Sequence, residues 1–359
     1  MKNNIYIFSN SVLSRKNNSF SLFTLPDSEP MHKIDLYESE EENVILPPTN
    51  KNFDDKPKNI PAESIEAFFT FGEVRFNTQF FKCASYYGIP VHIFNYYGNY
   101  IGSFIPATNE NYSGEIHLLQ YEAYLNNHKR LIIAKAIIES AVKNILSNLK
   151  THLFTGAELD EPINQINSLL EQAHFADSVS ELLGYEGSIR TIYYSAWPTL
   201  IKKETDFYKR IKQPPVGIVN SLISFGNSVL YSICLSEIYR TKLNPLIGFI
   251  HEVGDNKQPL IYDLSEIFKP VIVDKVIFRV LNLNMINEQD FKFTNDGYYL
   301  KDDPRKKFVE EIENRLSTVF IHKRLNRKIS YRSLIRMECY NLINYLKGNI
   351  KTYEPYRAG

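Results

Sequence analysis

Hydrophobic periodicity changes near Pro106, and this change limits the chain to a small set of folds. Before it, short segments rich in β-branched and aromatic residues, such as NIYIFSN and SFSLFTL, alternate with polar or proline-containing stretches, as strands alternate with turns. After it, apolar residues between 115 and 150 recur mostly three or four positions apart, which is the period of a helix. We therefore expect an α+β chain, with a β-rich domain followed by an all-α domain.

The first domain is expected to span residues 1–106 and to contain one or two small helices, within IPAESIEAFFTFG and NTQFFKCASYYG. A polar, proline-flanked loop is expected from about 46 to 61, and IPVHIFNYYGNYIGSFIP should form a hairpin. The second domain is expected to span 107–345. Its further helical patterns cover roughly 160–183, 188–211, 217–241, 262–280, 304–323 and 330–347. Residues 346–359 are expected to form a flexible tail.

Composition limits the class of protein. The 41 basic residues balance the 41 acidic ones, so net charge does not point to a nucleic acid, a membrane or an acidic substrate, and any polyanion site must come from local clusters. The three cysteines are far apart and form no zinc motif or disulfide framework, which favours a reducing compartment. The N-terminus lacks a signal-peptide core, and no window approaches about eighteen apolar residues. We expect a soluble cytoplasmic protein with no membrane span.

Common cofactor and nucleophile motifs are absent from the sequence. There is no GxxxxGK[ST] loop, no GxGxxG after a strand and no GxSxG elbow, and HEVGD lacks the second histidine of HExxH. Three weaker candidates remain. The first is Glu186 in LLGYEGSIRTIYYSAW, between Gly184 and Gly187 at the junction of two helical patterns. The glycines would let the chain turn sharply and hold Glu186 at an exposed corner, although a plain helix–helix turn explains the same letters.

The other two candidates follow an apolar run and open a helix. NPLIGFIHE places His251 after the run, where it is either a metal ligand or an ordinary hydrogen-bonded histidine. In IYDLSEIFKPVIVD, Asp263 and Glu266 are three residues apart, so on a helix they face the same side. They either share a divalent cation or form an acidic first turn favoured by the helix dipole. One imidazole with two or three carboxylates suits Mg²⁺ or Mn²⁺, which serve phosphodiester chemistry.

Basic residues gather in two stretches of the helical domain. The first holds Lys202, Lys203, Lys209, Arg210 and Lys212, and the second holds Lys323, Arg324, Arg327, Lys328, Arg332 and Arg336. A run of charge is usually a solvated face. In a chain of zero net charge, however, two such runs are a reasonable footprint for a DNA backbone.

Four motifs then match a known family in order and approximate spacing. They are LLGYEGSIRTIYY, QPPVGIVNSLISFGNSVLYS, LNPLIGFIHE and PLIYDLSEIFKPVIVD, with a gap of 65 residues from Glu186 to His251. In these motifs, and over about residues 1–345, the chain resembles the CRISPR adaptation integrase, the Cas-one family of spacer-integration endonucleases. The letters IPAESIEAFFTFG to IGSF in the first domain and DGYYLKDDPRKKFVEEIENRL in the second resemble that family as well.

The resemblance implies an N-terminal β-rich domain used for dimerisation and a C-terminal all-α domain that is catalytic and binds metal and DNA. It places the catalytic metal ligands at Glu186, His251 and Glu266. Asp263 would be a further ligand or a support, and Arg190 would face phosphate. The residues carried over with a positioning role are Asn220 and Asn227.

The activity that the resemblance implies is insertion of spacer DNA into a repeat array. A DNA 3′-hydroxyl attacks a phosphodiester, with Mg²⁺ or Mn²⁺ at the site. The implied partners are double-stranded and branched DNA (prespacer and repeat), a second copy of the chain, and a small bridging protein, Cas-two. Two alternatives stay open: a stand-alone metal-dependent nuclease acting on branched or single-stranded DNA, and a non-catalytic DNA-binding scaffold.

Overall fold

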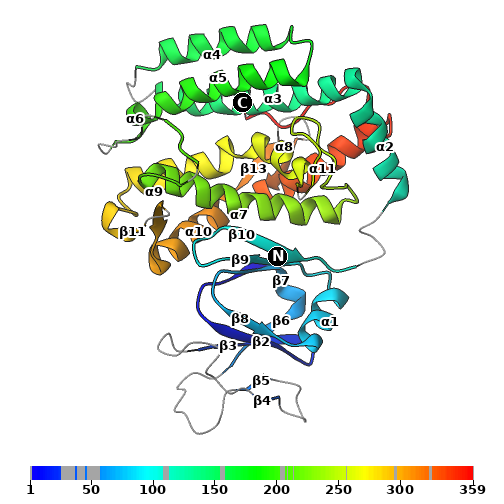
Figure 1. Cartoon of the computed structure of the whole chain (residues 1–359), viewed down its shortest axis with the longest axis vertical. Helices are drawn as coiled ribbons and strands as arrows, with labels where there is room; N and C mark the ends of the chain where they lie inside the picture. The colour runs from blue at the N-terminus through cyan, green and yellow to red at the C-terminus, as the bar shows by residue number, and fades with distance from the viewer. Residues whose placement is uncertain are drawn as a thin grey trace. The chain divides into compact units, whose positions relative to one another are not determined.

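The chain divides into two compact units, a smaller one, Met1–Asn109, and a larger one, Glu110–Gly359. The computed structural model describes residues 2–25, 37–38, 45–46, 57–107, 113–153, 158–202, 207, 209–212, 214–255, 257–294, 297–322 and 326–358. The first unit is rich in strands and the second in helices (Figure 1). This arrangement confirms the predicted α+β class.

Two four-stranded sheets build the first unit. One has the order β1-β7-β9-β10, in which β7 is parallel to both of its neighbours and β10 is antiparallel to β9; the other has the order β6-β3-β2-β8. The strands are β1 (Asn3–Ile7), β2 (Ser11–Lys16), β3 (Ser19–Thr24), β6 (Lys58–Pro61), β7 (Ile65–Thr70), β8 (Val74–Phe76), β9 (Val91–Phe94) and β10 (Tyr100–Phe104), and β4 (Tyr37–Glu38) pairs with β5 (Ile45–Leu46). Edge-to-face contacts of Phe20 with Phe68 and Phe80 join both sheets to helix α1 (Thr78–Tyr86) in one core.

One of the two predicted helices of this unit is wrong. NTQFFKCASYYG does form α1, followed by Gly88 at φ 65°. IPAESIEAFFTFG, in contrast, contains only a 3-10 turn (Ala62–Ser64) and is otherwise strand β7 with the end of β6. β7 lies between β1 and β9, and only Glu66 of its six residues is not fully buried. A strand buried on both faces gives a continuous apolar run, which periodicity cannot distinguish from a short buried helix.

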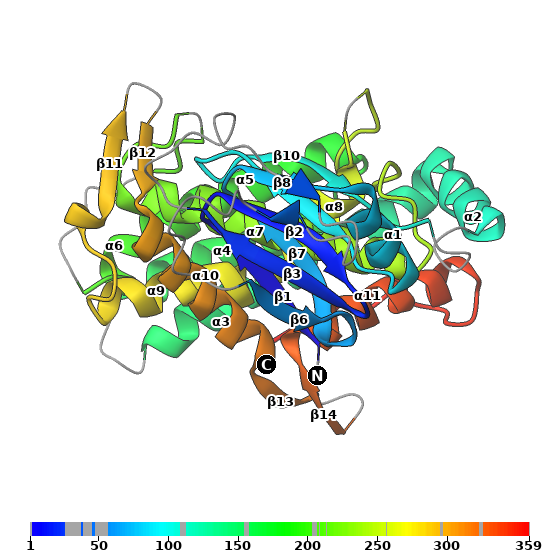
Figure 2. The same ribbon diagram turned by 90° about the horizontal axis from the view of Figure 1, so that it is seen from below.

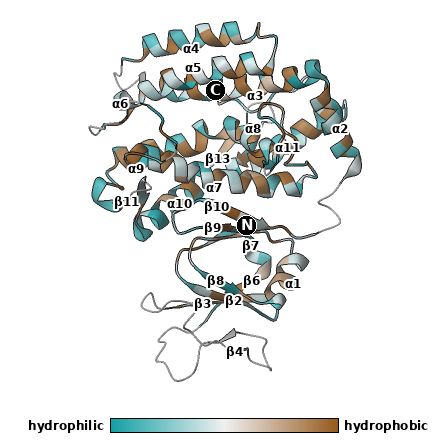
Figure 3. Cartoon of the chain, in the orientation of Figure 1, coloured by the Kyte–Doolittle hydropathy of each residue, from teal (hydrophilic) through white to brown (hydrophobic). Residues whose placement is uncertain are grey.

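Helices build the second unit around a buried core helix, α7 (Ile218–Arg240). The other helices are α2 (Gly114–Leu125), α3 (Asn127–Leu153), α4 (Asp160–Ala173), α5 (Val179–Ser195), α6 (Trp197–Leu200), α8 (Pro259–Phe268), α9 (Lys275–Asn282), α10 (Asp302–Ser317) and α11 (Tyr331–Leu346), with a π-helical turn, η3 (Pro270–Asp274), between α8 and α9. α4 is banded with hydrophilic and hydrophobic residues in Figure 3, as an amphipathic surface helix should be.

α7 is more apolar than we expected from the sequence, in which no window approaches about eighteen apolar residues. It is long enough to cross a bilayer and has a mean hydropathy of 1.5, but 72% of that stretch is buried inside the protein. Its apolar surface is therefore covered by the neighbouring helices of the unit, as in a core helix that is hydrophobic all round.

Two hairpins interrupt the helical unit, which is therefore not purely α. β11 (Phe291–Thr294) pairs with β12 (Gly297–Leu300), and β13 (Val319–His322) pairs with β14 (Arg327–Ser330); Figure 2 shows both as short projecting ribbons. β13 falls inside the helical pattern predicted for 304–323. Strands of four residues are too short for alternation to stand out against the helical period around them.

The C-terminal segment packs on the helical unit, so the prediction of a flexible tail is wrong. Tyr353 is only 5% exposed. The backbone N–H of Tyr356 donates to Glu338 Oε2 at 3.0 Å, and that of Ala358 donates to Asn144 Oδ1 at 2.6 Å. The segment looks like a loop by composition, but its tyrosines and backbone anchor it to α3 and α11.

Substitutions at two glycines test the packing of helices α5 and α7. A Cβ at Gly184 in α5 would meet nothing within 4 Å, whereas a Cβ at Gly226 in α7 would lie 2.7 Å from Cγ1 of Val273. We expect Gly184→Ala to raise the free energy of unfolding by roughly 0.5–1 kcal/mol through helix propensity. Gly226→Ala should instead lower it by about 1 kcal/mol or more through overpacking. Urea unfolding measures both; destabilisation by Gly184→Ala would contradict a continuous α5.

Candidate functional site

Glu186 lies in the middle of a continuous helix and not at a corner between two helices. α5 runs from Val179 to Ser195, capped by the Ser178 side chain, and passes through Gly184 and Gly187 without a break. The predicted corner is therefore wrong: the glycines lie where α5 is solvent-exposed, and their lack of a side chain does not bend the helix. The helical path places Arg190 one turn after Glu186, and Arg190 Nε donates to Glu186 Oε1 at 2.8 Å.

His251 lies in the irregular segment between α7 and α8. Asp263 of α8 holds the part of this segment that leads to His251. The carboxylate of Asp263 accepts backbone N–H bonds from Phe249, Ile250 and His251. It also bonds the His251 ring at Nδ1, 2.7 Å from Asp263 Oδ1. Asp263 is fully buried, and both of its oxygens are used by these four contacts. Its contacts therefore fit the supporting role better than that of a ligand, and they leave Nε2 of His251 as the ring atom for a ligand contact.

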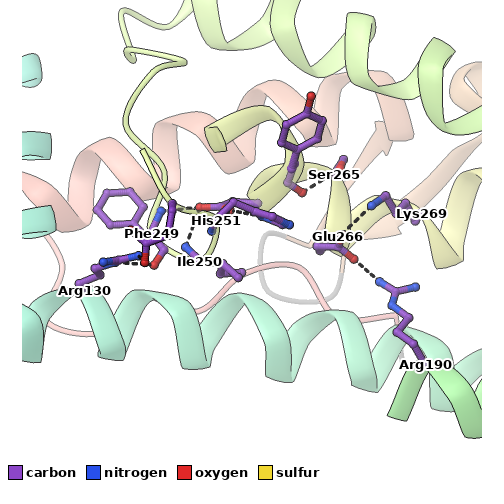
Figure 4. A network of polar contacts seen from close by, with 11 residues as sticks. Arg130, Arg190, Phe249, Ile250, His251, Ser265, Glu266 and Lys269 are labelled. Carbon is purple, nitrogen blue, oxygen red and sulfur yellow. Dashed lines mark hydrogen bonds and ion pairs between the residues drawn. The ribbon is translucent and has the colours of Figure 1, made fainter. Parts of the chain in front are cut away.

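Glu266 lies one turn after Asp263 and between two cations. Lys269 Nζ donates to Glu266 Oε1 at 2.6 Å, and Arg190 Nη2 donates to Glu266 Oε2. Arg190 thus bridges Glu186 and Glu266 from α5 to α8; Figure 4 shows its contact with Glu266. The His251 ring points along the same face towards Glu266 in Figure 4.

Charge compensation sets the protonation of this group. Burial alone would raise the pKa of Glu266, but the positive charges of Lys269 and Arg190 outweigh it and lower the pKa to about 2. Burial alone would lower the pKa of His251, but its hydrogen bond to Asp263 and the charges of Asp263 and Glu266 raise it above its ordinary value. Glu266 is therefore ionised across the physiological range.

A second polar cluster lies next to this group, at the π-helical turn. Asp274, 2% exposed, accepts a hydrogen bond from the Tyr193 hydroxyl at 3.0 Å, and the same hydroxyl accepts one from Asn148 at 3.0 Å. Burial raises the pKa of Asp274 to about 7. The side-chain atom Nη1 of Arg190 is buried without a hydrogen-bond partner among the described residues.

The other residues predicted for the site lie on different elements. Asn220 and Arg210 tie a loop to α7: Arg210 Nη1 donates to Asn220 Oδ1 at 3.0 Å, and Asn220 Nδ2 donates to Val216 O at 2.8 Å. Arg210 also donates to Ser224, so its guanidinium is engaged within the protein. Asn227 is partly buried on α7.

The basic residues behave in three ways. Lys202, Lys209, Arg327 and Lys328 are exposed, as expected of contacts for a polyanion. Arg332 forms an ion pair with Glu313, and Arg336 forms one with the buried Glu237. Lys203, Lys323 and Arg324 lie outside the described residues.

Two further residues, Lys269 and Glu252, contact this group of side chains or its neighbours and were not predicted from the sequence. Lys269 is one helical turn after Glu266, a spacing that marks it as a neighbour on the same face. Glu252, next to His251, accepts a hydrogen bond from Arg130 at 2.8 Å. Neither carries a motif that could have identified it.

Within the part of the chain that the structure describes, no group of three or more His, Cys, Asp or Glu side chains is arranged to hold a metal ion. The reason lies in the ion pairs above. Arg190 and Lys269 neutralise Glu186 and Glu266, so these carboxylates face cationic side chains. The chemistry of the donors still fits a hard divalent cation: they are two carboxylates and an imidazole whose Nε2 has no hydrogen-bond partner among the described residues.

Comparisons with known proteins give one family. The family model described as "CRISPR associated protein Cas1" matches residues 38–314. A protein of Fusobacterium nucleatum subsp. nucleatum, "CRISPR-associated endonuclease Cas1", is 40% identical over 357 residues, covering 99% of this chain and 97% of its own. A solved CAS1 protein from Thermotoga maritima has a TM-score of 0.78 at 33% identity, covering 98% of this chain and 99% of its own.

A solved "Casposase bound to integration product" is similar in fold. Its TM-score is 0.79 at 20% identity, and the match covers 100% of this chain and 95% of the casposase. At this level of identity the likeness concerns the fold alone.

Removing the charge of Asp263 should loosen the His251 segment. Asp263→Asn keeps the shape but turns one oxygen that accepts N–H bonds into an NH₂ group, so donor faces donor in a buried site. We expect the free energy of unfolding to fall by about 2–4 kcal/mol, as for lost buried charge-assisted hydrogen bonds. Thermal or urea unfolding measures it, with Asp255→Asn on an exposed loop position as the matched control.

Asp274 should make stability depend on pH. Its folded-state pKa of about 7 lies above the ordinary 3.8, so the ionised form destabilises the fold; this penalty grows from about pH 4 to pH 7 and is complete above it. Asp274→Asn keeps an acceptor for Tyr193. We expect it to stabilise the protein on the order of 2 kcal/mol or more at pH 8 and much less at pH 4. Urea unfolding at both pH values checks this; an equal effect at both would contradict it.

Proposed function

This chain belongs to the CRISPR-associated Cas1 family, and on that premise we propose that it is a DNA endonuclease and integrase that inserts spacer DNA into a CRISPR repeat array. The observation that carries the proposal is Arg190 bridging Glu186 and Glu266 beside His251. Three motifs far apart in the sequence meet there, and their side chains are the donors that phosphodiester chemistry requires.

Glu186, Glu266 and Nε2 of His251 would hold Mg²⁺ or Mn²⁺. When bound, the cation offsets the negative charge that builds on the phosphate oxygens during transfer. The Arg190 guanidinium bonds both carboxylates, so a cation held there would compete with Arg190 for them. Asp263 holds the His251 ring through Nδ1.

The cationic side chains then have a second role. The planar guanidinium of Arg190 has the geometry to bind two phosphate oxygens, and its buried Nη1 has no hydrogen-bond partner among the described residues. Lys269 stays close to Glu266 and keeps the local charge balanced. The remaining partner of the reaction is the 3′-hydroxyl of the incoming DNA, which attacks the phosphodiester at a repeat border and expels the existing 3′-oxygen.

The partners follow from the same proposal. Exposed Lys202, Lys209, Arg327 and Lys328 would contact the backbones of double-stranded and branched DNA. We infer a homodimer through the β-rich unit, the small second CRISPR-associated protein as a bridge, and action in the cytoplasm, where the array resides. The family resemblance supports these partners.

Glu186→Gln separates the proposed integrase from the two alternatives. The amide keeps the bond to Arg190 but loses the charge needed for a cation, so we expect strand transfer into a repeat-bearing plasmid, with the bridging protein present, to fall at least about 100-fold. Glu171→Gln, on an exposed position of α4, should leave transfer unchanged. Hydrolysis without joined products from the wild type would favour a stand-alone nuclease. Neither transfer nor hydrolysis by the folded wild type would favour a non-catalytic scaffold, and full transfer by Glu186→Gln would contradict the role proposed for Glu186.

A further inference from the structure

The segment that carries His251 has few backbone partners of its own. Residues 241–252 connect α7 to the loop before α8 as turns and bends, without the hydrogen-bond ladder of a helix or a sheet. Side chains from elsewhere must therefore hold it. Asp263 supplies one anchor, from the side of α8.

The helices α2 and α3 hold the segment at further points. Gln120, fully buried in α2, donates to Asn244 O at 3.2 Å and to Ile247 O at 3.4 Å, and it accepts from Asn244 N at 2.7 Å. Arg130 of α3 donates from Nε to Phe249 O at 2.9 Å (Figure 4). The two helices thus hold the segment from its start to the residues next to His251.

Arg130 grips the chain on both sides of His251. While Nε binds the carbonyl of Phe249, Nη2 binds Glu252 Oε1 at 2.8 Å. Tyr124 holds the other oxygen of Glu252 at 3.0 Å, and its ring lies 4.4 Å from the Arg130 guanidinium carbon. The guanidinium is nearly buried, with 13% of the side chain exposed, although Glu252 is exposed. One planar fork therefore fixes the backbone before His251 and the side chain after it.

We infer that Arg130, with Glu252 and Tyr124, is a positioning clamp that sets the direction of the His251 imidazole. Asp263 takes the N–H of Phe249 and Arg130 takes its carbonyl oxygen, so both polar groups of that residue are fixed from opposite sides. His251 can then turn only about its own side-chain bonds, and Asp263 restricts those through Nδ1. The clamp rests on the proposed function, since a fixed imidazole matters when Nε2 binds a cation. None of the three residues is itself a ligand.

The planar guanidinium of Arg130 allows a specific test by substitution with lysine. Lysine keeps the positive charge and most of the aliphatic stem, but its single ammonium cannot bind Phe249 O and Glu252 in the geometry of two parallel N–H donors. Arg130→Lys therefore breaks the clamp without burying an uncompensated charge. Lys129→Ala is the matched control, because it removes the neighbouring ion pair, 2.6 Å from Glu122, on the outer surface of the same helix.

The test is Mn²⁺ binding by the full-length protein, measured by calorimetry without DNA. We expect Arg130→Lys and Glu252→Ala each to raise the Kd for Mn²⁺ about 10-fold, as for residues that orient a metal ligand. Lys129→Ala should leave it unchanged. In a His251→Ala background, Arg130→Lys should cause no further loss, because the side chain that the clamp orients is gone.

The outcomes that would overturn the clamp are distinct from those that would overturn the metal site. Unchanged Mn²⁺ affinity in Arg130→Lys, or an equal loss with and without His251, refutes the clamp while the site stands. Wild-type protein that binds no Mn²⁺, or His251→Ala that binds it normally, refutes the proposed site itself. Amide hydrogen exchange guards against misfolding: in metal-free Arg130→Lys, only residues around 249–252 should exchange faster, and faster exchange throughout the helices would also count against the clamp.

Discussion

The buried carboxylate of Asp263 is the contact on which the rest of the site depends. It is a negative charge without exposure to water, and its stability requires that the four donors of the 249–251 region stay in place. Gly248 shows how close the segment comes: a Cβ there would lie 2.9 Å from Asp263 Oδ2 and 2.7 Å from Cβ of Pro259. The irregular segment thus packs tightly against α8, and this packing fixes the position of His251.

Two cationic side chains pair with the two carboxylates around Glu266. Arg190 and Lys269 stabilise two carboxylates that would otherwise repel each other on facing helices. In the proposed metal site, a cation would compete with Arg190 and Lys269 for the same carboxylates. Arg190 is largely buried and pairs with both carboxylates, and its Nη1 has no hydrogen-bond partner among the described residues.

The sequence predicted the class of fold better than it predicted local geometry. The helical period predicted α3, α7 and α11, because long amphipathic or buried helices repeat the signal over several turns. It failed at β7 and at Glu186, where burial on both faces and an exposed helical glycine give letters that fit two conformations. Asp263 could not be assigned as ligand or support, since that depends on which backbone N–H groups meet it. The hydrogen bonds from Arg130 to Phe249 and Glu252 join residues more than a hundred positions apart, and no local pattern records them.

The π-helical turn η3 has a consequence for how this stretch can vary in length. Pro270 lacks an N–H, and side chains of other helices donate to three carbonyls in and just before the turn. Asn144 binds Ile267 O, Asn148 binds Pro270 O and Arg315 binds Val271 O. Deleting one residue here would restore a regular helix but rotate everything beyond it by about 100° relative to Glu266. Insertions and deletions in related chains should therefore accumulate in the connecting loops and leave the run from Glu266 to Lys275 at constant length.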